Sequence, residues 1–305
     1  MNVTGSIASA TMPAMGELRQ PTGTAFTIRD PLPWPDVAAI AREGESLGYA
    51  AVLLPEIGAR DTVATLMGLA GETSTLLLGT GVIPMAARTS KLAAMAAATV
   101  QERSGGRHLL GVGTGGAAPG ALVRLRTYVE EIRILIGGSA PGVALRLPLP
   151  APVPIWIAAL GPRATRLAGE IADGVILNWC TPDRVAEARD AIRATAAEAG
   201  RDPNSVTISV YVRAAFSDRA DEALLAAAAE YSSYPAYARQ FEVMGVEPSP
   251  GAVVDAVCLR GDRDAARERL DAYRRAGADL PVVYPALAPG EGPEASIAVL
   301  RALAP

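Results

Sequence analysis

The segment Leu76-Leu77-Leu78-Gly79-Thr80-Gly81-Val82-Ile83-Pro84 is the most informative stretch of this sequence. It begins as an apolar run of the length found in buried strands of parallel sheets. Two glycines then bracket Thr80, and Pro84 closes the segment. A glycine within a strand marks a bulge, or a point where another backbone or a ligand comes close. Taken alone, the segment fits a bulge and an ordinary strand end equally well.

Strand and helix patterns alternate on both sides of this segment. Strands are predicted at 24–28, 50–54, 76–84, 108–112, 155–158, 174–177, 206–212 and 280–284. A helical pattern follows the strands; over 90–103, one predicted apolar face carries Leu92, Met95, Ala96, Thr99 and Val100. Eight such units in 305 residues predict a (β/α)8 TIM barrel rather than a doubly wound sheet. We expect residues 1–21, which show no periodicity, to form a flexible N-terminal arm, and residues 22–305 to form a single barrel domain.

Composition narrows the classes of partner. Hydrophobic residues make up 50% of the chain, charged residues 20%, and the net charge is −4. This slight acidity gives no reason to expect nucleic acid or a membrane surface as partner. No apolar run has the length of a membrane-spanning helix, and the first residues lack the pattern of a signal peptide. We therefore expect a cytoplasmic protein that acts on a small molecule.

Histidine and cysteine are scarce. His108 is the only histidine, so a site with several histidine ligands is impossible. It lies inside an apolar strand, where a structural, hydrogen-bonded role is expected rather than a part in a catalytic triad. Cys180 and Cys258 show neither metal nor redox spacing. No metal site is predicted.

Functional groups of a TIM barrel lie where its strands end, and three strand ends carry notable residues. Gly111-Val112-Gly113-Thr114-Gly115-Gly116 formally matches a dinucleotide-binding pattern, but its first glycine lies within the strand and no N-terminal βαβ unit accompanies it. In a barrel, such glycines let a ring or a phosphate approach the backbone. Leu160-Gly161-Pro162-Arg163-Ala164-Thr165 joins a strand to a helix start, and is either a phosphate site or a plain junction.

The end of the second strand carries two acids and a basic residue. Glu56 and Asp61 flank Arg60 in Pro55-Glu56-Ile57-Gly58-Ala59-Arg60-Asp61. Either acid is a candidate general acid or orienting group. Asp61 fits helix capping equally well, and an ion pair between Arg60 and Glu56 is the structural alternative for the pair. Function is favoured for Glu56.

Together these motifs resemble a known family. Pro55-Glu56…Arg60-Asp61, Leu78-Gly79-Thr80-Gly81-Val82, Ser104-Gly105-Gly106-Arg107…Leu110-Gly111-Val112-Gly113-Thr114-Gly115 and Ala158-Ala159-Leu160-Gly161-Pro162 follow one another as they do in the bacterial luciferase-like monooxygenase superfamily. The chain is most similar to its coenzyme F420-dependent oxidoreductases, the branch like methylenetetrahydromethanopterin reductase. The resemblance extends from residue 23 to 289.

The resemblance implies a deazaflavin cofactor at the C-terminal mouth of the barrel. It implies a non-prolyl cis peptide at Gly81–Val82, forming a bulge behind the ring. The expected cofactor-binding residues are Thr80, Gly81, Val82, Gly113, Thr114, Gly115, Leu160, Gly161, Pro162, Thr165 and Asn178. The cofactor would exchange a hydride with the substrate, while the protein supplies positioning and a proton path.

The chain also departs from the family pattern. Many relatives carry histidine at the end of strand two, where this chain has Glu56, and several carry an acid where it has Gly116. The loop 115–121 is short, so the pocket is expected to be open or covered by a second subunit of a homodimer.

The leading hypothesis is an F420-dependent oxidoreductase that transfers a hydride between F420 and an organic substrate, with Glu56 as first and Asp61 as second candidate catalytic residue. The alternatives are an FMNH2-dependent luciferase-like monooxygenase, with FMN as its cofactor, and a cofactor-binding paralogue without turnover.

Overall fold

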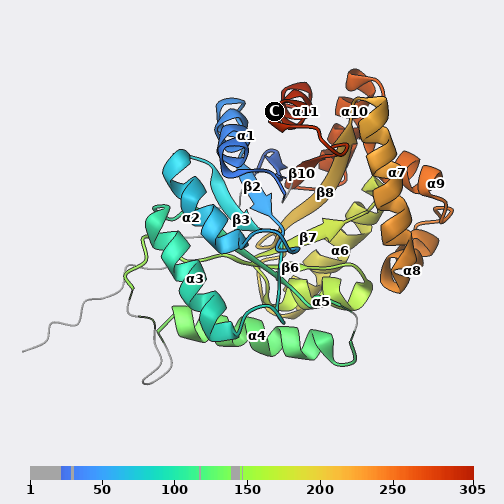
Figure 1. The fold of residues 1–305 in the computed structure, drawn as a ribbon. Helices are drawn as coiled ribbons and strands as arrows, with labels where there is room; N and C mark the ends of the chain where they lie inside the picture. Colours follow the sequence, from blue (N-terminus) through green and yellow to red (C-terminus); the bar gives the residue numbers. More distant parts are fainter. Residues whose placement is uncertain (1–21, 29–30, 117, 139–144, 146) are drawn as a thin grey trace, which may run out of the picture.

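The computed structural model describes residues 22–28, 31–116, 118–138, 145 and 147–305, which form a closed parallel barrel ringed by helices (Figure 1). Every strand pairs in parallel with its neighbours, in the order β10-β1-β2-β3-β5-β6-β7-β8, and pairing of β10 with β8 closes the circle. This confirms the predicted (β/α)8 barrel. The arm predicted at 1–21 lies outside the described residues.

The barrel strands are short and almost completely buried, as expected where helices cover a parallel sheet. They are β1 (Ala25–Phe26), β2 (Ala51–Leu54), β3 (Leu77–Thr80), β5 (His108–Gly113), β6 (Ile155–Ala158), β7 (Gly174–Asn178), β8 (Thr207–Ala215) and β10 (Leu280–Pro285).

Several outer helices begin or end at residue types typical of helix termini. Thr181 caps one helix by accepting from the Arg184 N–H, and Asp262 caps another by accepting from the Asp264 N–H. Gly48, with φ +85°, follows the end of the first helix. The helices are α1 (Trp34–Ser46), α2 (Thr62–Glu72), α3 (Ser90–Arg103), α4 (Ala121–Ile136), α5 (Pro162–Ile171), α6 (Pro182–Glu198), α7 (Asp218–Ser233), α8 (Pro235–Val243), α9 (Pro250–Val257), α10 (Arg263–Arg275) and α11 (Pro293–Ala302).

Three short elements add to the predicted pattern. The strand predicted at 76–84 is divided at the bulge, and its second part, β4 (Ile83–Pro84), pairs with β5. Between α8 and α10 the chain adds α9 and then β9 (Leu259–Arg260), which pairs with the end of β8 at Ala214 and Ala215. Helices α7, α8 and α9 form a group at one side of the barrel (Figure 1).

The predicted apolar face of α3 was wrong for Leu92, Met95 and Thr99, while Val100 is buried as predicted. The side chains of Leu92 and Met95 are exposed, while the buried positions are Ala93, Ala94, Ala97, Ala98, Val100 and Gln101. Small alanine side chains let this helix lie close to its neighbours α2 and α4. The larger apolar residues therefore point outward.

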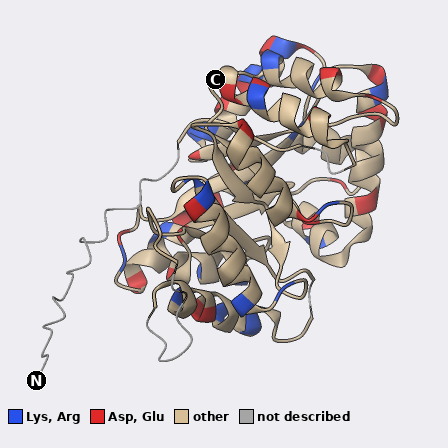
Figure 2. Ribbon diagram, turned by 60° about the vertical axis from the view of Figure 1, so that its left-hand side comes forward, with Lys and Arg blue, Asp and Glu red and all other residues tan. Residues whose placement is uncertain are grey.

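Charged residues lie mainly on the helices and loops, and the strands are largely free of them (Figure 2). No helix of the described residues is both long and apolar enough to cross a membrane.

Candidate active site at the barrel mouth

The Gly81–Val82 peptide bond is cis, as predicted. It lies between β3 and β4, where the chain leaves the barrel wall. The Gly81 N–H donates to the Leu54 carbonyl at 2.7 Å, and the Thr80 hydroxyl bridges to β5, donating to the Gly111 carbonyl at 2.7 Å and accepting from the Gly111 N–H at 2.8 Å. The hydroxyl of Thr80 thus fixes the bulge to the neighbouring strand.

Tyr211 of β8 supports the bulge from across the barrel. Its hydroxyl lies 3.0 Å from the carbonyl oxygen of Gly81 and 3.3 Å from that of Leu53. Burial raises the pKa of this phenol well above its usual range. A Cβ atom at position 81 would lie 2.2 Å from the Tyr211 oxygen, so only glycine leaves room for this contact.

The glycines of β5 are required by strand packing rather than by a dinucleotide. A Cβ atom at position 111 would lie 2.0 Å from the Thr80 carbonyl oxygen. One at position 113 would lie 2.9 Å from a methyl group of Val82, so that side chain is seated against Gly113. In contrast, a Cβ atom at Gly116 would meet nothing within 4 Å.

Glu56 lies beside the bulge and forms an ion pair with Arg88. The Glu56 N–H donates to the Val82 carbonyl at 3.2 Å. The Arg88 guanidinium donates to both carboxylate oxygens of Glu56, at 3.2 and 2.9 Å, and to Asp61 Oδ2 at 2.6 Å. The side chains of Arg88 and Glu56 are only 11% and 15% exposed. These groups border an open depression of about 460 Å³.

The ion pair between Glu56 and Arg60, which was the alternative to a functional role, does not form. Arg60 instead donates to the Leu32 carbonyl, and Glu56 pairs with Arg88, a residue that the sequence analysis missed. Asp61 does cap α2, by accepting from the Ala64 N–H at 2.9 Å. Burial raises the pKa of Asp61, but this hydrogen bond and the Arg88 guanidinium outweigh burial and hold the pKa below its ordinary value.

Helix α5 begins at this mouth without a side-chain cap. Its N-terminal residue is Pro162, and Gly161 precedes it in an extended conformation. The buried Thr165 hydroxyl donates back to the Gly161 carbonyl at 3.2 Å. A Cβ atom at Gly161 would meet nothing within 4 Å, so space is open beside the helix start.

Asn178 belongs to a polar network on the other side of the mouth. Its side-chain amide donates to the Tyr237 hydroxyl at 3.0 Å and accepts from Arg213 Nη1 at 2.9 Å. Gln240 of α8 donates to the Asn178 carbonyl at 2.9 Å. Arg213 was not among the residues predicted from the sequence, although a lone arginine at the end of an apolar strand is a usable signal.

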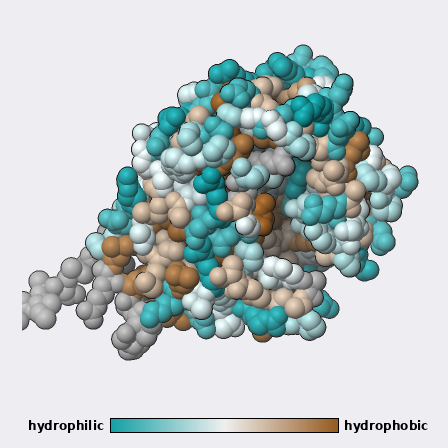
Figure 3. Space-filling view, viewed as in Figure 1, coloured by the Kyte–Doolittle hydropathy of each residue, from teal (hydrophilic) through white to brown (hydrophobic). Residues whose placement is uncertain are grey.

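The remaining predicted site residues lie near these groups. Thr114 and Gly115 follow β5, where Gly115 has φ +70° and the Thr114 hydroxyl accepts from the Gly116 N–H at 3.4 Å. Leu160 follows β6 and is partly buried. The face seen in Figure 1 is hollowed near its centre, between α2 and α3 on one side and α7 and α8 on the other (Figure 3).

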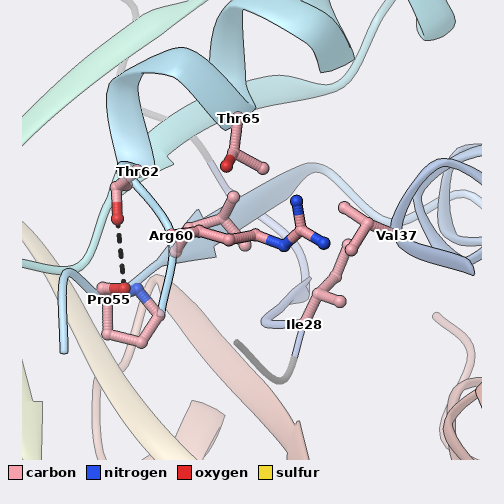
Figure 4. Close-up of a pocket in the computed structure, with 7 residues that line it drawn as sticks. Ile28, Val37, Pro55, Arg60, Thr62 and Thr65 are labelled. Atoms are coloured by element: carbon pink, nitrogen blue, oxygen red, sulfur yellow. Dashed lines mark hydrogen bonds between the residues drawn. The ribbon is translucent and has the colours of Figure 1, made fainter. Parts of the chain in front are cut away.

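A second cavity lies outside the barrel mouth, between β2, α1 and α2. Figure 4 shows the Arg60 side chain extending across it toward Ile28 and Val37, and the Thr62 hydroxyl bonded to the Pro55 carbonyl at 3.1 Å. Its volume of about 20 Å³ suffices for a single water molecule and excludes a substrate.

His108 has the structural role that was predicted. It is buried in β5, and its Nδ1 lies 2.8 Å from the Leu78 carbonyl oxygen. A carbonyl only accepts, so Nδ1 carries the proton. Burial lowers the pKa of His108 to about 4, which keeps the ring neutral. Cys180 and Cys258 are buried free thiols, and the described residues contain no cluster suited to a metal ion.

Comparisons with known proteins agree with this architecture. A family model described as luciferase-like monooxygenase matches residues 16–280. A 5,10-methylenetetrahydromethanopterin reductase of Methanolobus tindarius is 29% identical over 263 residues, which cover 79% of each chain.

Solved structures share the fold at lower sequence identity. The coenzyme F420-dependent tetrahydromethanopterin reductase of Methanopyrus kandleri has a TM-score of 0.75 at 18% identity, over 92% of this chain and 97% of that one. The oxygenating constituent of 3,6-diketocamphane monooxygenase of Pseudomonas putida, solved with FMN, has a TM-score of 0.69 at 15% identity, over 93% and 96%. With a family match over most of its length, this chain belongs to the luciferase-like monooxygenase family of enzymes.

Proposed function

We propose that this enzyme is a coenzyme F420-dependent oxidoreductase that transfers a hydride between the deazaflavin and a small organic substrate. The observation that carries the proposal is the combination, at one barrel mouth, of the Gly81–Val82 bulge with open backbone at the ends of β5 and β6. The similarity to a reductase of tetrahydromethanopterin supports the choice of cofactor.

The residues present fit such a cofactor. Strands β5 and β6 are paired neighbours, so the glycines that follow them lie at the same edge of the mouth. Gly116 and Gly161 face open space, and the start of α5 has no side-chain cap. Its first N–H groups are therefore free of a capping side chain and suit a phosphate. We assign the phosphate to Thr114, Gly115, Gly161, Pro162 and Thr165, and the face of the ring to Gly81 and Val82.

The bound deazaflavin would supply the hydride donor or acceptor. The protein's part is to hold the reactants and to manage the proton. Glu56 is bonded through its N–H to the bulge, and its carboxylate is oriented by Arg88. We assign the proton-transfer role to Glu56. Asp61, with its lowered pKa and its capping bond, is better suited to hold Arg88 in place.

Separate titrations of the purified protein with oxidised F420 and with FMN test the cofactor. We expect saturable F420 binding, followed by fluorescence, and FMN binding at least tenfold weaker. Tight binding of FMN without binding of F420 would instead support the monooxygenase alternative. Binding of F420 without oxidation of its reduced form by any member of a carbonyl panel would support the paralogue without turnover.

Glu56→Gln tests the assigned proton-transfer residue. Because the amide keeps the shape and still accepts from Arg88, we expect F420 affinity within twofold of wild type and turnover lower by about 10²-fold. Asp61→Asn is the matched control, since it keeps the cap and should reduce turnover much less. Equal losses in both variants would remove the distinction between the two acids.

The predicted homodimer stays a prediction; the exposed Leu92 and Met95 of α3 and Val123 of α4 offer it an apolar surface.

A further inference from the structure

Arg213 is a nearly buried arginine at the C-terminal mouth of the barrel. It lies near the end of β8, two residues beyond Tyr211 and hence on the same face of the strand, and it pairs in register with Tyr284 of β10. Only 8% of its surface is exposed. Tyr211 supports the bulge from below, so Arg213 lies one layer nearer to the opening.

No carboxylate among the described residues forms an ion pair with Arg213, whereas Arg88 has two. Within the part of the chain that the structure describes, Arg213 makes one hydrogen bond, which Nη1 donates to the neutral side chain of Asn178. A guanidinium has five N–H donors. Its Nε and Nη2 atoms make no hydrogen bond to the described residues, and a small part of the residue stays exposed. A charge removed from water without a counter-ion is costly.

Aromatic rings hold the guanidinium in place. Its central carbon lies 4.0 Å from the ring centroid of Trp179 and 5.1 Å from those of Tyr231 and Tyr284. Rings at these distances attract a cation and orient its plane. They offer no lone pair in the plane of the N–H groups. The buried indole N–H of Trp179 also has no acceptor among the residues that the structure describes.

We propose that Arg213 binds a carboxylate of the substrate, and that the substrate of this enzyme is an organic acid with an apolar or planar body. A carboxylate would take up the open N–H donors in the two-pronged geometry that arginine favours, and the rings around it would contact the body of the acid. That this acid is the reacting substrate rests on the proposed function. The binding of a carboxylate to Arg213 does not.

The substrate is favoured over the cofactor as the source of this anion because of position. The open backbone assigned to the cofactor phosphate follows β5 and β6. Strand β8 is separated from β6 by β7 in the barrel order. Arg213 therefore lies on a different side of the mouth from the phosphate site.

Calorimetric titration tests the proposal without knowledge of the natural substrate. The probes are benzoate, phenylacetate and succinate, each compared with its uncharged amide, on cofactor-free and on F420-loaded protein. We expect at least one carboxylate to bind to wild type while its amide does not. Arg213→Met should weaken that binding at least tenfold, and Arg213→Lys should weaken it less.

Two controls make the outcome specific. Arg239→Met removes an exposed arginine of the neighbouring α8 and should leave carboxylate binding unchanged. Thermal melting and F420 affinity of Arg213→Met should stay near wild type. The proposal is overturned if no carboxylate binds to wild type, if Arg213→Met binds it equally well, or if Arg213→Met loses F420 instead. Arg213-dependent carboxylate binding in a protein that fails to bind F420 would keep this site and remove the proposed reaction.

Discussion

The two sides of the barrel mouth differ in how their arginine charges are neutralised. On the bulge side, formed by β2, β3 and β5, Arg88 is matched by Glu56 and Asp61. On the aromatic side, formed by β7, β8 and β10, the described partners of Arg213 are aromatic rings and the Asn178 amide. Both arginines are nearly buried, but only the first has counter-ions among the residues that the structure describes.

The difference distinguishes a charged group whose counter-ions belong to the protein from one that a ligand could neutralise. A paired arginine contributes to the geometry of the protein that surrounds it. A buried arginine without an anion keeps a cost in the free protein that a bound anion removes. The bulge side therefore keeps a fixed geometry. The aromatic side gains free energy when an external anion binds to Arg213.

The largest expected effect lies in the backbone of the bulge side. Gly111→Ala places a methyl group 2.0 Å from the Thr80 carbonyl oxygen, a backbone atom that cannot turn aside as a side chain can. We expect a loss of stability on the order of 3 kcal/mol or failure to fold. Gly116→Ala, in the same motif, faces open space and should change stability by less than about 0.5 kcal/mol.

Chemical denaturation of the two glycine variants measures this difference. If both lost the same amount, packing would not be what requires glycine at position 111. Gly116→Ala also reports on the cofactor, because it should weaken F420 binding while leaving the melting temperature unchanged.

An intermediate effect is expected when each arginine is replaced by methionine. Arg88→Met leaves the Glu56 carboxylate without its partner, so we expect a loss on the order of 2 kcal/mol. Arg213→Met removes a charge that has no counter-ion and should change stability by less than about 1 kcal/mol, in either direction. Melting temperatures of both variants without ligand test this order. A greater loss for Arg213→Met would show that the rings alone make its charge stabilising.

The smallest effect concerns the pH dependence of the bulge side. The folded chain protonates His108 near pH 4, and the unfolded chain near pH 6.5. The unfolded state therefore binds more protons between these values, and stability falls as the pH falls, by about 1.4 kcal/mol per unit at most. The contribution is fully present above pH 6.5.

His108→Asn removes this dependence while keeping a donor for the Leu78 carbonyl. Its stability at pH 7.5 should be lower than that of wild type, but its decline between pH 6.5 and 5.5 should be shallower by about 1 kcal/mol. Denaturation at a series of pH values gives both quantities. Parallel declines would mean that other groups cause the acid sensitivity.

Much of the fold was predictable because it depends on local patterns. Apolar runs separated by helical patterns gave the units, and eight units gave the barrel; local caps such as Thr181 and Asp262 then start individual helices. The apolar face of α3 was not predictable from hydrophobicity. Its alanines are buried because neighbouring helices lie close, and that closeness is a property of the assembled barrel.

The site was predictable in part. The position of the cis bond followed from resemblance to a family, and the packing around it did not. Tyr211 occupies the space that a side chain at position 81 would need, yet it is separated from Gly81 by 130 residues of sequence. Arg88, likewise, meets Glu56 only because the chain after the bulge returns to the end of β2. Such contacts arise from tertiary structure alone.

The hydrogen bond from the Glu56 N–H to the Val82 carbonyl has a consequence for protein engineering. It connects the backbone after β2 to the backbone after β3, and this connection fixes the position from which the Glu56 side chain extends. The downstream residues 57–60 lie beyond the bond, before Asp61 starts α2. Residues 57–59 of this loop can therefore be redesigned while the distance between Glu56 and the bulge is preserved; Arg60 is kept because it donates to the Leu32 carbonyl.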